Sequence, residues 1–459
     1  MPWILLVSLP VVSAGCAFAR ERPATVVVAP TLPPEWTQTP TLPSPAPRTS
    51  TAPSVIATST VPTRPAASPT PYPTGSPVVR NRAPVELTMV QMFSESEGWG
   101  IEGASILTTL DGGRTWRDVT PPDALPGETR VAAYGGFLNA YVGWMIFAPN
   151  EDRPSMYDQS GIPPGASVWY TSSSGRTWNT SAPLDHTLFE YGSFPVLPSF
   201  SMVDSQTGWL RLSGDFVAAG PKVFAEYLHT IDGGATWDHL SSTWCPDVGS
   251  CYSDDSPGWV SEMGFINQNG WILVDDSGCG PCYGNQPAPA YWLSVNGGSK
   301  WRLHTLPSPQ AELDLFDQYW QCYPQQLNLL NEEVIRLVVA CWDKREGSGE
   351  AAYLYASGDG GASWDTHPLP PELGSLREGK TRMLFINGTH GLLLGREMFR
   401  TSDGGATWRH INTVSWDGQF NFVDLWLGWA VARSGDETAL VYTENGSEAW
   451  QILNPVGWP

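Results

Sequence analysis

The sequence predicts an all-β fold, a single seven-bladed β-propeller that follows a signal peptide and a disordered linker. Three observations support this prediction. An octapeptide of the form Ser/Thr-x-Asp-Gly-Gly-x-Thr-Trp occurs in seven intact or eroded copies, a Gly-Trp pair precedes most copies, and successive copies are 42 to 64 residues apart. Repeats of about 40 to 50 residues that each supply four short strands are typical of propeller blades. Seven repeats therefore give one ring over residues 86–459.

The first 15 residues are mostly apolar, which suits a signal peptide and is too short for a mature membrane span. Ser13, Ala14 and Gly15 directly precede Cys16. This arrangement resembles the lipobox of bacterial lipoproteins, in which the cysteine is lipidated. We expect residues 1–15 to be a lipoprotein-type signal peptide, and the protein to be extracytoplasmic and membrane-anchored through Cys16. The alternative is a secreted protein, cleaved after the Ala-Phe-Ala sequence at 17–19.

Residues 16–85 are rich in Pro and Thr and lack a periodic apolar pattern. Such a segment cannot bury enough apolar surface to offset its ordering entropy, so we expect a disordered linker. The formal charge of the whole chain is −21. A nucleic-acid partner needs a basic footprint, and an anionic membrane surface also attracts basic segments. We therefore expect no nucleic acid, and membrane contact through a lipid anchor only.

The octapeptide has the chemistry of a turn between two strands. Glycine supplies positive φ, the Asp carboxylate accepts backbone N–H groups, and Thr and Trp begin the next strand. Four copies keep every position; in two eroded copies Asn can accept the same hydrogen bonds without a charge. The residues to which we assign this structural role are Asp111, Trp116, Trp178, Asp232, Trp237, Asn296, Trp301, Asp359, Trp364, Asp403, Trp408, Asn445 and Trp450.

The first repeat illustrates the four strands, A to D, that we expect in each blade: 87–93, 98–101, 105–109 and 115–119. The Gly-Trp pair opens strand B, and the octapeptide joins strand C to strand D. The two signatures account for 12 of the 23 Trp, so most of this unusual Trp content serves packing between blades. The sequence leaves open how the ring closes. The Gly-Trp pairs are Gly98-Trp99, Gly143-Trp144, Gly208-Trp209, Gly270-Trp271 and Gly428-Trp429.

Both signatures are similar to those of the BNR/Asp-box propellers over residues 86–459. Their combination resembles most closely the BNR-like photosystem II assembly and stability factors; sialidases, two-propeller xyloglucanases and sortilin are more distant. The resemblance implies the propeller fold and, from the closest branch, a role as an assembly or stability factor for a membrane complex. In these families the Asp box is a structural turn away from the active site.

Insertions in the repeats fall on one side of the expected ring. A–B and C–D turns share one face of a propeller, which we call the box face; B–C and D–A connections share the other, the long-loop face. The A–B turns are short throughout. Because insertions on one face of a repeat array usually mark the binding face, we expect binding on the long-loop face. The insertions are residues 149–167, 240–258, 275–290, 304–323 and 343–350.

Six cysteines follow Cys16, and all belong to the long-loop face around the fourth and fifth blades. In an exported protein we expect them to form disulfides, with 15 possible connectivities. A hairpin centred near Glu332 places Cys322 and Cys341 almost opposite each other. A zinc site at Cys279 and Cys282 is the alternative and needs further ligands, so we expect no metal and no cofactor. The candidates are Cys245, Cys251, Cys279, Cys282, Cys322 and Cys341.

Aromatic residues accompany these cysteines. They could stack on sugars or anchor a protein partner, or equally fill a small core beneath the long loops. Aspartates in the same loops match no calcium-loop spacing. The candidate binding residues are Trp244, Tyr252, Tyr283, Tyr319, Trp320, Tyr323 and Trp342.

The sequence assigns no catalytic residue. The Arg-Ile-Pro motif of sialidases is absent, as are His-Glu-x-x-His, Gly-x-Ser-x-Gly and a phosphate-binding loop. We therefore expect a monomeric, non-catalytic propeller that binds a protein or glycan partner. A glycoside hydrolase, sialidase- or xyloglucanase-like, is the alternative, because two carboxylates at the right distance on the long-loop face would suffice.

Overall fold

The computed structural model describes residues 83–122, 124, 131–149, 165–185, 194–215, 222–245, 260–274, 288–310, 315–316, 320–343, 350–373, 376 and 380–458. All of them lie in one compact unit, Pro77–Pro459. The predicted signal peptide, Cys16 and most of the predicted linker lie outside the described residues. No helix within the described ranges has the length and apolar character that a membrane span requires.

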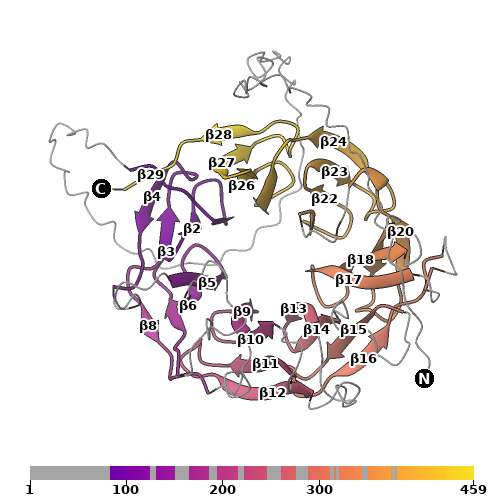
Figure 1. Ribbon diagram of the computed structural model, residues 1–459, viewed down its shortest axis with the longest axis horizontal. Coiled ribbons are helices and arrows are strands. Elements are labelled where there is room, and N and C mark those ends of the chain that lie inside the picture. Colours follow the sequence, from indigo (N-terminus) through magenta and orange to yellow (C-terminus); the bar gives the residue numbers. More distant parts are fainter. Residues whose placement is uncertain are drawn as a thin grey trace, which may run out of the picture. The chain divides into compact units, whose positions relative to one another are not determined.

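Seven blades, counted over the described residues, surround a central opening in the order of the sequence (Figure 1). Each blade contains four antiparallel strands, with strand A nearest the opening and strand D farthest from it; blade 1 has a fifth strand beyond strand D. This arrangement confirms the predicted all-β, seven-bladed propeller. The sequence also located the strands of blade 1 to within two residues, because its octapeptide and Gly-Trp pair mark their ends.

Blades 1 to 4 contain β1 (Met89–Met92), β2 (Gly98–Glu102), β3 (Ser105–Thr109) and β4 (Thr115–Asp118); β5 (Val131–Phe137), β6 (Gly143–Pro149), β7 (Trp169–Thr171) and β8 (Asn179–Thr180); β9 (Phe194–Met202), β10 (Gly208–Asp215), β11 (Lys222–Thr230) and β12 (Asp238–Cys245); and β13 (Val260–Ile266), β14 (Asn269–Val274), β15 (Ala290–Ser294) and β16 (Arg302–Thr305).

Blades 5 to 7 contain β17 (Trp320–Leu329), β18 (Ile335–Asp343), β19 (Glu350–Ser357) and β20 (Asp365–Pro368); β21 (Arg382–Phe385), β22 (Gly391–Leu394), β23 (Glu397–Thr401) and β24 (Arg409–Thr413); and β25 (Asp417–Phe422), β26 (Gly428–Ser434), β27 (Glu437–Thr443) and β28 (Gln451–Leu453). A 3₁₀ turn, η3 (Pro371–Leu373), follows β20.

The ring closes through a C-terminal strand that crosses from blade 7 to blade 1. β29 (Val456–Gly457) pairs in parallel with β4 at the outer edge of blade 1. Trp458 N donates to Trp116 O at 2.6 Å, and Val85 N donates to Pro455 O at 3.0 Å. The two ends of the propeller sequence therefore hold each other in place.

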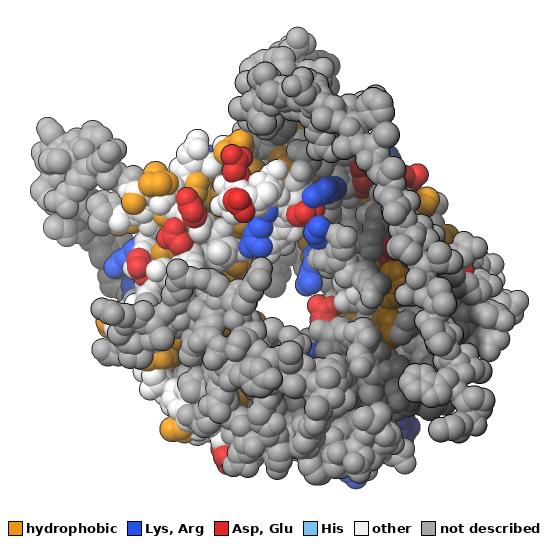
Figure 2. Space-filling view, in the orientation of Figure 1, with side chains coloured by type: hydrophobic (Ala, Val, Ile, Leu, Met, Phe, Trp, Pro, Cys, Tyr) orange, Lys and Arg blue, Asp and Glu red, His pale blue; other side chains and the backbone are white. Residues whose placement is uncertain are grey.

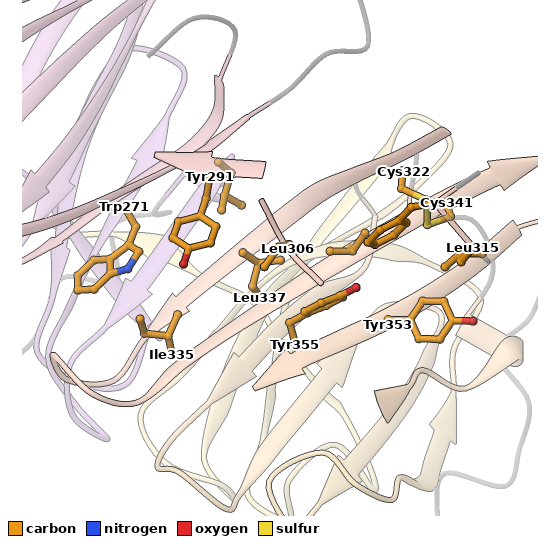
Figure 3. Close-up of a cluster of buried hydrophobic side chains, with 13 residues drawn as sticks. Trp271, Tyr291, Leu306, Leu315, Cys322, Ile335, Leu337, Cys341, Tyr353 and Tyr355 are labelled. Atoms are coloured by element: carbon orange, nitrogen blue, oxygen red, sulfur yellow. A yellow bond between two sulfur atoms is a disulfide. The ribbon is translucent and has the colours of Figure 1, made fainter. Parts of the chain in front are cut away.

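Hydrophobic clusters fill the junctions between neighbouring blades. Figure 3 shows the junction of blades 4 and 5, where Trp271 and Tyr291 of blade 4 face Ile335, Leu337 and Tyr355 of blade 5. Equivalent clusters lie at the other six junctions among the described residues. A closed ring of seven blades has one more junction than an open array of seven. Closure by β29 therefore buries an additional apolar surface, the main source of folding free energy.

Candidate functional site

The A–B and C–D turns of all seven blades form the box face. In blade 1, Asp111 Oδ1 accepts hydrogen bonds from Arg114 N at 3.1 Å and Thr115 N at 2.8 Å, and Oδ2 accepts from Thr115 Oγ1 at 2.7 Å. Gly112 and Gly113 have φ values of 77° and 90°. Asp232, Asp359 and Asp403 accept the equivalent bonds in their own turns.

The eroded copies keep the turn with other acceptors. Asn296 Oδ1 accepts from Lys300 N at 2.9 Å, and Asn445 Oδ1 accepts from Ala449 N at 2.9 Å. In blade 2, Ser173 Oγ accepts from Thr177 N at 3.0 Å. The fold of this face therefore depends on a side-chain acceptor and not on a charge.

Each blade also donates a hydrogen bond to a box-face turn of the next blade. Trp144 Nε1 donates to Gly233 O at 2.7 Å, and Trp209 Nε1 donates to Gly297 O at 2.9 Å. The Trp of a Gly-Trp pair thus links two blades as well as filling the junction. The remaining junctions use Trp99 to Asn139 O, Tyr291 to Gly361 O, Arg336 to Gly388 O, Arg400 to Gly446 O and Trp429 to Gly112 O.

The box carboxylates are poor candidates for catalysis. Hydrogen bonds from the side chain and backbone of Thr407 hold the pKa of Asp403 at about 2. Those from Ser363 hold the pKa of Asp359 at about 2. A carboxylate that stays ionised this far below neutral pH has no proton to donate as a general acid. These groups are fixed negative charges on the box face.

The longest connections begin and end at strand ends on the opposite face, and they are concentrated in one sector of the ring. In blades 1, 6 and 7, strand B is followed almost at once by strand C, as in Leu394 to Glu397 of blade 6. In blade 2 the same connection runs from Pro149 to Trp169, and in blade 4 from Val274 to Ala290. The D–A connection from Cys245 to Val260 joins blades 3 and 4. Long connections therefore rise from blades 2 to 5, and much of their length lies outside the described residues.

The structure places some of the predicted site residues of this sector. Cys322 and Cys341 are directly opposite each other on β17 and β18 and form a disulfide. Tyr323 is buried, with its ring 5.7 Å from that of Trp342, which packs against the cluster between blades 5 and 6. Trp320 is partly exposed at the start of β17. Trp320 and Trp342 are both half-buried and pack against core clusters, so of the three aromatic candidates on these two strands Tyr323 is the one closed to a ligand.

Trp244 and Cys245 lie at the end of β12, and nothing is described of their side chains. Six further candidates lie outside the described residues, so the structure does not bring them together or separate them. These are Cys251, Tyr252, Cys279, Cys282, Tyr283 and Tyr319.

The central opening is lined by a polar network that the sequence analysis missed. Strand A of each blade has its outer neighbour on one side only, and in blades 1, 4, 5 and 6 a side chain from the preceding blade accepts hydrogen bonds from the edge that faces the opening. Gln326 Oε1 accepts from Met383 N at 2.6 Å, and Asn328 Oδ1 accepts from Phe385 N at 2.9 Å. The same Gln-x-Asn arrangement at Gln419 and Asn421 covers the edge of β1. Since an unpaired buried N–H is costly, these amides stabilise the inner edge of the ring.

Glu262 adds a half-buried carboxylate to this network. Its Oε2 accepts from Leu327 N at 2.6 Å, and its Oε1 lies 3.6 Å from Arg382 Nη2 of blade 6. Burial raises the pKa of Glu262, against the opposing effects of Arg382 and Arg211. A carboxyl group whose pKa is raised by burial can serve as a general acid, which makes Glu262 the described carboxyl group best suited to that role.

Beside the opening, blades 6 and 7 carry charged side chains of both signs (Figure 2). Arg396 Nε and Nη2 contact the two carboxylate oxygens of Asp417 at 2.7 and 3.0 Å, and Lys380 Nζ lies 3.6 Å from Asp417. The hydrogen bond from Arg396 lowers the pKa of Asp417. Among the described residues, no group of three or more His, Cys, Asp and Glu could hold a metal ion.

Comparisons with known proteins add relatives of this fold, although no family model matches the chain. A xyloglucanase from Paenibacillus sp. is 24% identical over 226 residues, which are 47% of this chain and 20% of that protein. The chain therefore spans about a fifth of the length of this curated relative.

Among solved structures, YCF48 bound to a D1 peptide is 15% identical with a TM-score of 0.47, covering 79% of this chain and 95% of YCF48. YCF48 from Cyanidioschyzon merolae is 14% identical with a TM-score of 0.43, covering 81% and 98%. A puromycin-hydrolyzing peptidase of Mycobacterium tuberculosis is 11% identical with a TM-score of 0.50, covering 81% and 54%. At these identities the likeness is one of fold.

Proposed function

We propose that this chain is an exported, lipid-anchored, non-catalytic propeller whose long-loop face binds a protein or glycan partner. In this proposal Cys16 carries the lipid, and the linker over residues 16–85 separates the propeller from the membrane. The resemblance in the repeat signatures to assembly and stability factors suggests a membrane complex as the partner. The protein acts as a monomer and uses no cofactor.

The observation that carries the proposal is the distribution of connection lengths. Seven blades share one framework, yet the longest connections, those of 14 or more residues, all rise from blades 2 to 5 and begin and end on one face. A long loop adds entropic cost without strengthening the junctions between blades. Loops of this kind on a rigid scaffold commonly carry binding residues. The disulfide between Cys322 and Cys341 braces the base of this sector.

Site-specific photo-crosslinking in the native host membrane tests the binding face. A photoreactive amino acid would replace Tyr283 or Trp320 on the long-loop side, and Leu303 on outer strand β16 would be the control position. We expect discrete adducts from the first two positions and none from Leu303. Adducts at all three positions, or at Leu303 alone, would contradict a binding role for the long-loop face.

The lipid anchor has its own test. Labelling of the full chain with radioactive palmitate should mark the wild type and disappear in Cys16→Ser. An unlabelled wild type that is recovered from the culture medium would instead support secretion.

The similarity to a xyloglucanase supports a second candidate, a glycoside hydrolase. Glu262 would be its general acid, with a second carboxylate about 5 to 9.5 Å away. The full chain should be incubated with xyloglucan, sialosides and bacterial polysaccharides, and released sugars identified by mass spectrometry. Release that is lost in Glu262→Gln would establish hydrolysis and overturn the non-catalytic proposal. No release from any substrate would refute the hydrolase candidate.

A further inference from the structure

The box face carries exposed apolar side chains at positions where the turn does not require them. The second residue of each octapeptide is at the tip of the C–D turn. In blades 1, 3 and 4 this residue is Leu110, Ile231 or Val295, with exposed fractions of 74%, 68% and 70%. In blades 2 and 6 the same position is Ser172 or Ser402. Since serine fits the identical turn, folding does not explain the three aliphatic residues.

Two aromatic side chains extend this set around the ring. Tyr141, in the A–B turn of blade 2, is 49% exposed and contacts Glu97 through its hydroxyl group at 3.3 Å. Trp426, in the A–B turn of blade 7, is 52% exposed, and the Arg400 guanidinium lies 4.4 Å from its ring centroid. The apolar side chains thus come from five consecutive blades: 7, 1, 2, 3 and 4. We call this set, Trp426, Leu110, Tyr141, Ile231 and Val295, the apolar arc.

Single exposed apolar residues are ordinary, but five of the eight large exposed apolar side chains among the described residues are on this one face. Exposed apolar side chains gathered on one face mark interaction surfaces. Large side chains of this kind gain free energy when a partner covers them, and aromatic residues are enriched at such contacts. Blades 5 and 6 have no counterpart among the large exposed apolar side chains of the described residues. The apolar arc therefore covers only part of the ring, as expected for contact with one partner; side chains needed by the repeat itself would occur on every blade.

The charge of the box face selects the kind of partner. Its seven A–B and seven C–D turns contain 12 Asp and Glu against three basic residues, Arg114, Arg176 and Lys300. The guanidinium groups of Arg336 and Arg400 also contact these turns, which leaves the face with a formal charge of −7. The box aspartates among them stay ionised well below neutral pH. An anionic membrane and a second copy of the same face would both be repelled by this charge. A surface that is both apolar and acidic complements a partner that is both apolar and basic.

We propose that the box face is a second docking surface, which binds a basic, amphipathic protein segment through the apolar arc. This site is independent of the long-loop face and lies on the opposite side of the ring. The two faces would allow the propeller to hold two partners at once.

A defined peptide tests the proposal. The probe is a fluorescently labelled 14-residue helix of Leu and Lys with all Leu on one side, and binding to the full chain is measured by fluorescence anisotropy. The test variant is Leu110→Ser/Ile231→Ser/Val295→Ser, which uses the residue that blades 2 and 6 already have. The control variant is Leu303→Ser/Ile452→Ser, which removes exposed aliphatic side chains from the outer strands β16 and β28. Both variants keep the charge of the protein.

We expect the test variant to bind the probe at least roughly tenfold more weakly, and the control variant to bind like the wild type. The variant Ser402→Leu, which extends the arc to blade 6, should strengthen binding. Equal binding by the test variant and the wild type, or an equal loss in both variants, would overturn the proposal. So would arc-dependent co-sedimentation with neutral phosphatidylcholine vesicles, which would identify a lipid-inserting surface, or arc-dependent self-association in sedimentation velocity. The melting temperature of each variant is compared with that of the wild type. Equal values exclude a loss of folding as the cause of a change in binding.

Discussion

Replacement of one glycine in a box should separate the contribution of backbone conformation from that of the link between blades. Gly361 has a φ of 90°, and a Cβ atom there would lie 2.9 Å from Tyr291 Oη of blade 4. In the wild type, Tyr291 Oη donates a hydrogen bond to Gly361 O at 2.9 Å. Gly361→Ala therefore forces an L-residue into a left-handed conformation and displaces the hydroxyl group that links the two blades.

The conformation should cost about 1 to 2 kcal/mol, and loss of the hydrogen bond about 1 kcal/mol. We expect Gly361→Ala to lower the free energy of unfolding by about 2 to 3 kcal/mol, measured by urea denaturation with Trp fluorescence. Tyr291→Phe, which removes the hydrogen bond alone, should account for about 1 kcal/mol of that loss.

Gly358 of the same turn is the matched control, because a Cβ atom there meets no atom within 4 Å. Gly358→Ala should leave stability unchanged or raise it slightly, since alanine reduces the entropy of the unfolded chain. If Gly361→Ala and Gly358→Ala agree within about 0.5 kcal/mol, the reasoning on both φ and the link between blades is refuted.

Three further changes test other parts of the ring. Cys322→Ala/Cys341→Ala opens a loop with a sequence separation of 19 and should lower the free energy of unfolding by about 3 kcal/mol in urea; a wild type equally stable with and without reductant would contradict this. Hydrogen bonds lower the pKa of Asp403 to about 2. The ionised carboxylate therefore stabilises the fold above about pH 4, and this contribution is lost as the pH falls through 2. In Asp403→Asn the melting temperature should therefore depend less on pH between pH 2 and 5 than in the wild type. A pH dependence as steep as that of the wild type would contradict this role of Asp403. Gln326→Ala should speed hydrogen exchange at the Met383 amide, which loses its acceptor; unchanged protection there would show that the amide does not depend on Gln326.

The sequence predicted the repeating part of the fold well because each blade contains its own markers. The octapeptide places the end of strand C and the start of strand D, and Gly-Trp places the start of strand B, so β2 begins, β3 ends and β4 begins at the predicted residues. Ring closure was not predictable in the same way. β29 has two residues and no repeat signature, and its partner β4 is more than 300 residues away in the sequence.

The candidate site was predicted less completely. The sequence located the long-loop face through its insertions and paired Cys322 with Cys341, because hairpin register can be counted along the chain. It did not reveal that Tyr323 is buried, since burial there depends on the next blade. The Gln-x-Asn pairs were also missed. Polar residues two apart in a strand look like a solvent-exposed face, and only the closed ring turns them toward the free edge of a neighbouring blade.

The junctions explain how this propeller can change its surfaces without losing its fold. Three chemically different donors, Trp144, Tyr291 and Arg400, make the same kind of bond to the next box. A junction therefore requires a donor that reaches a backbone carbonyl, and not a particular residue. The turn requires an acceptor at its third position, which Asn296 supplies without a charge. Neither requirement involves the second residue of the octapeptide or the B–C connections. Those positions are free to diverge, and they are the ones that differ between blades.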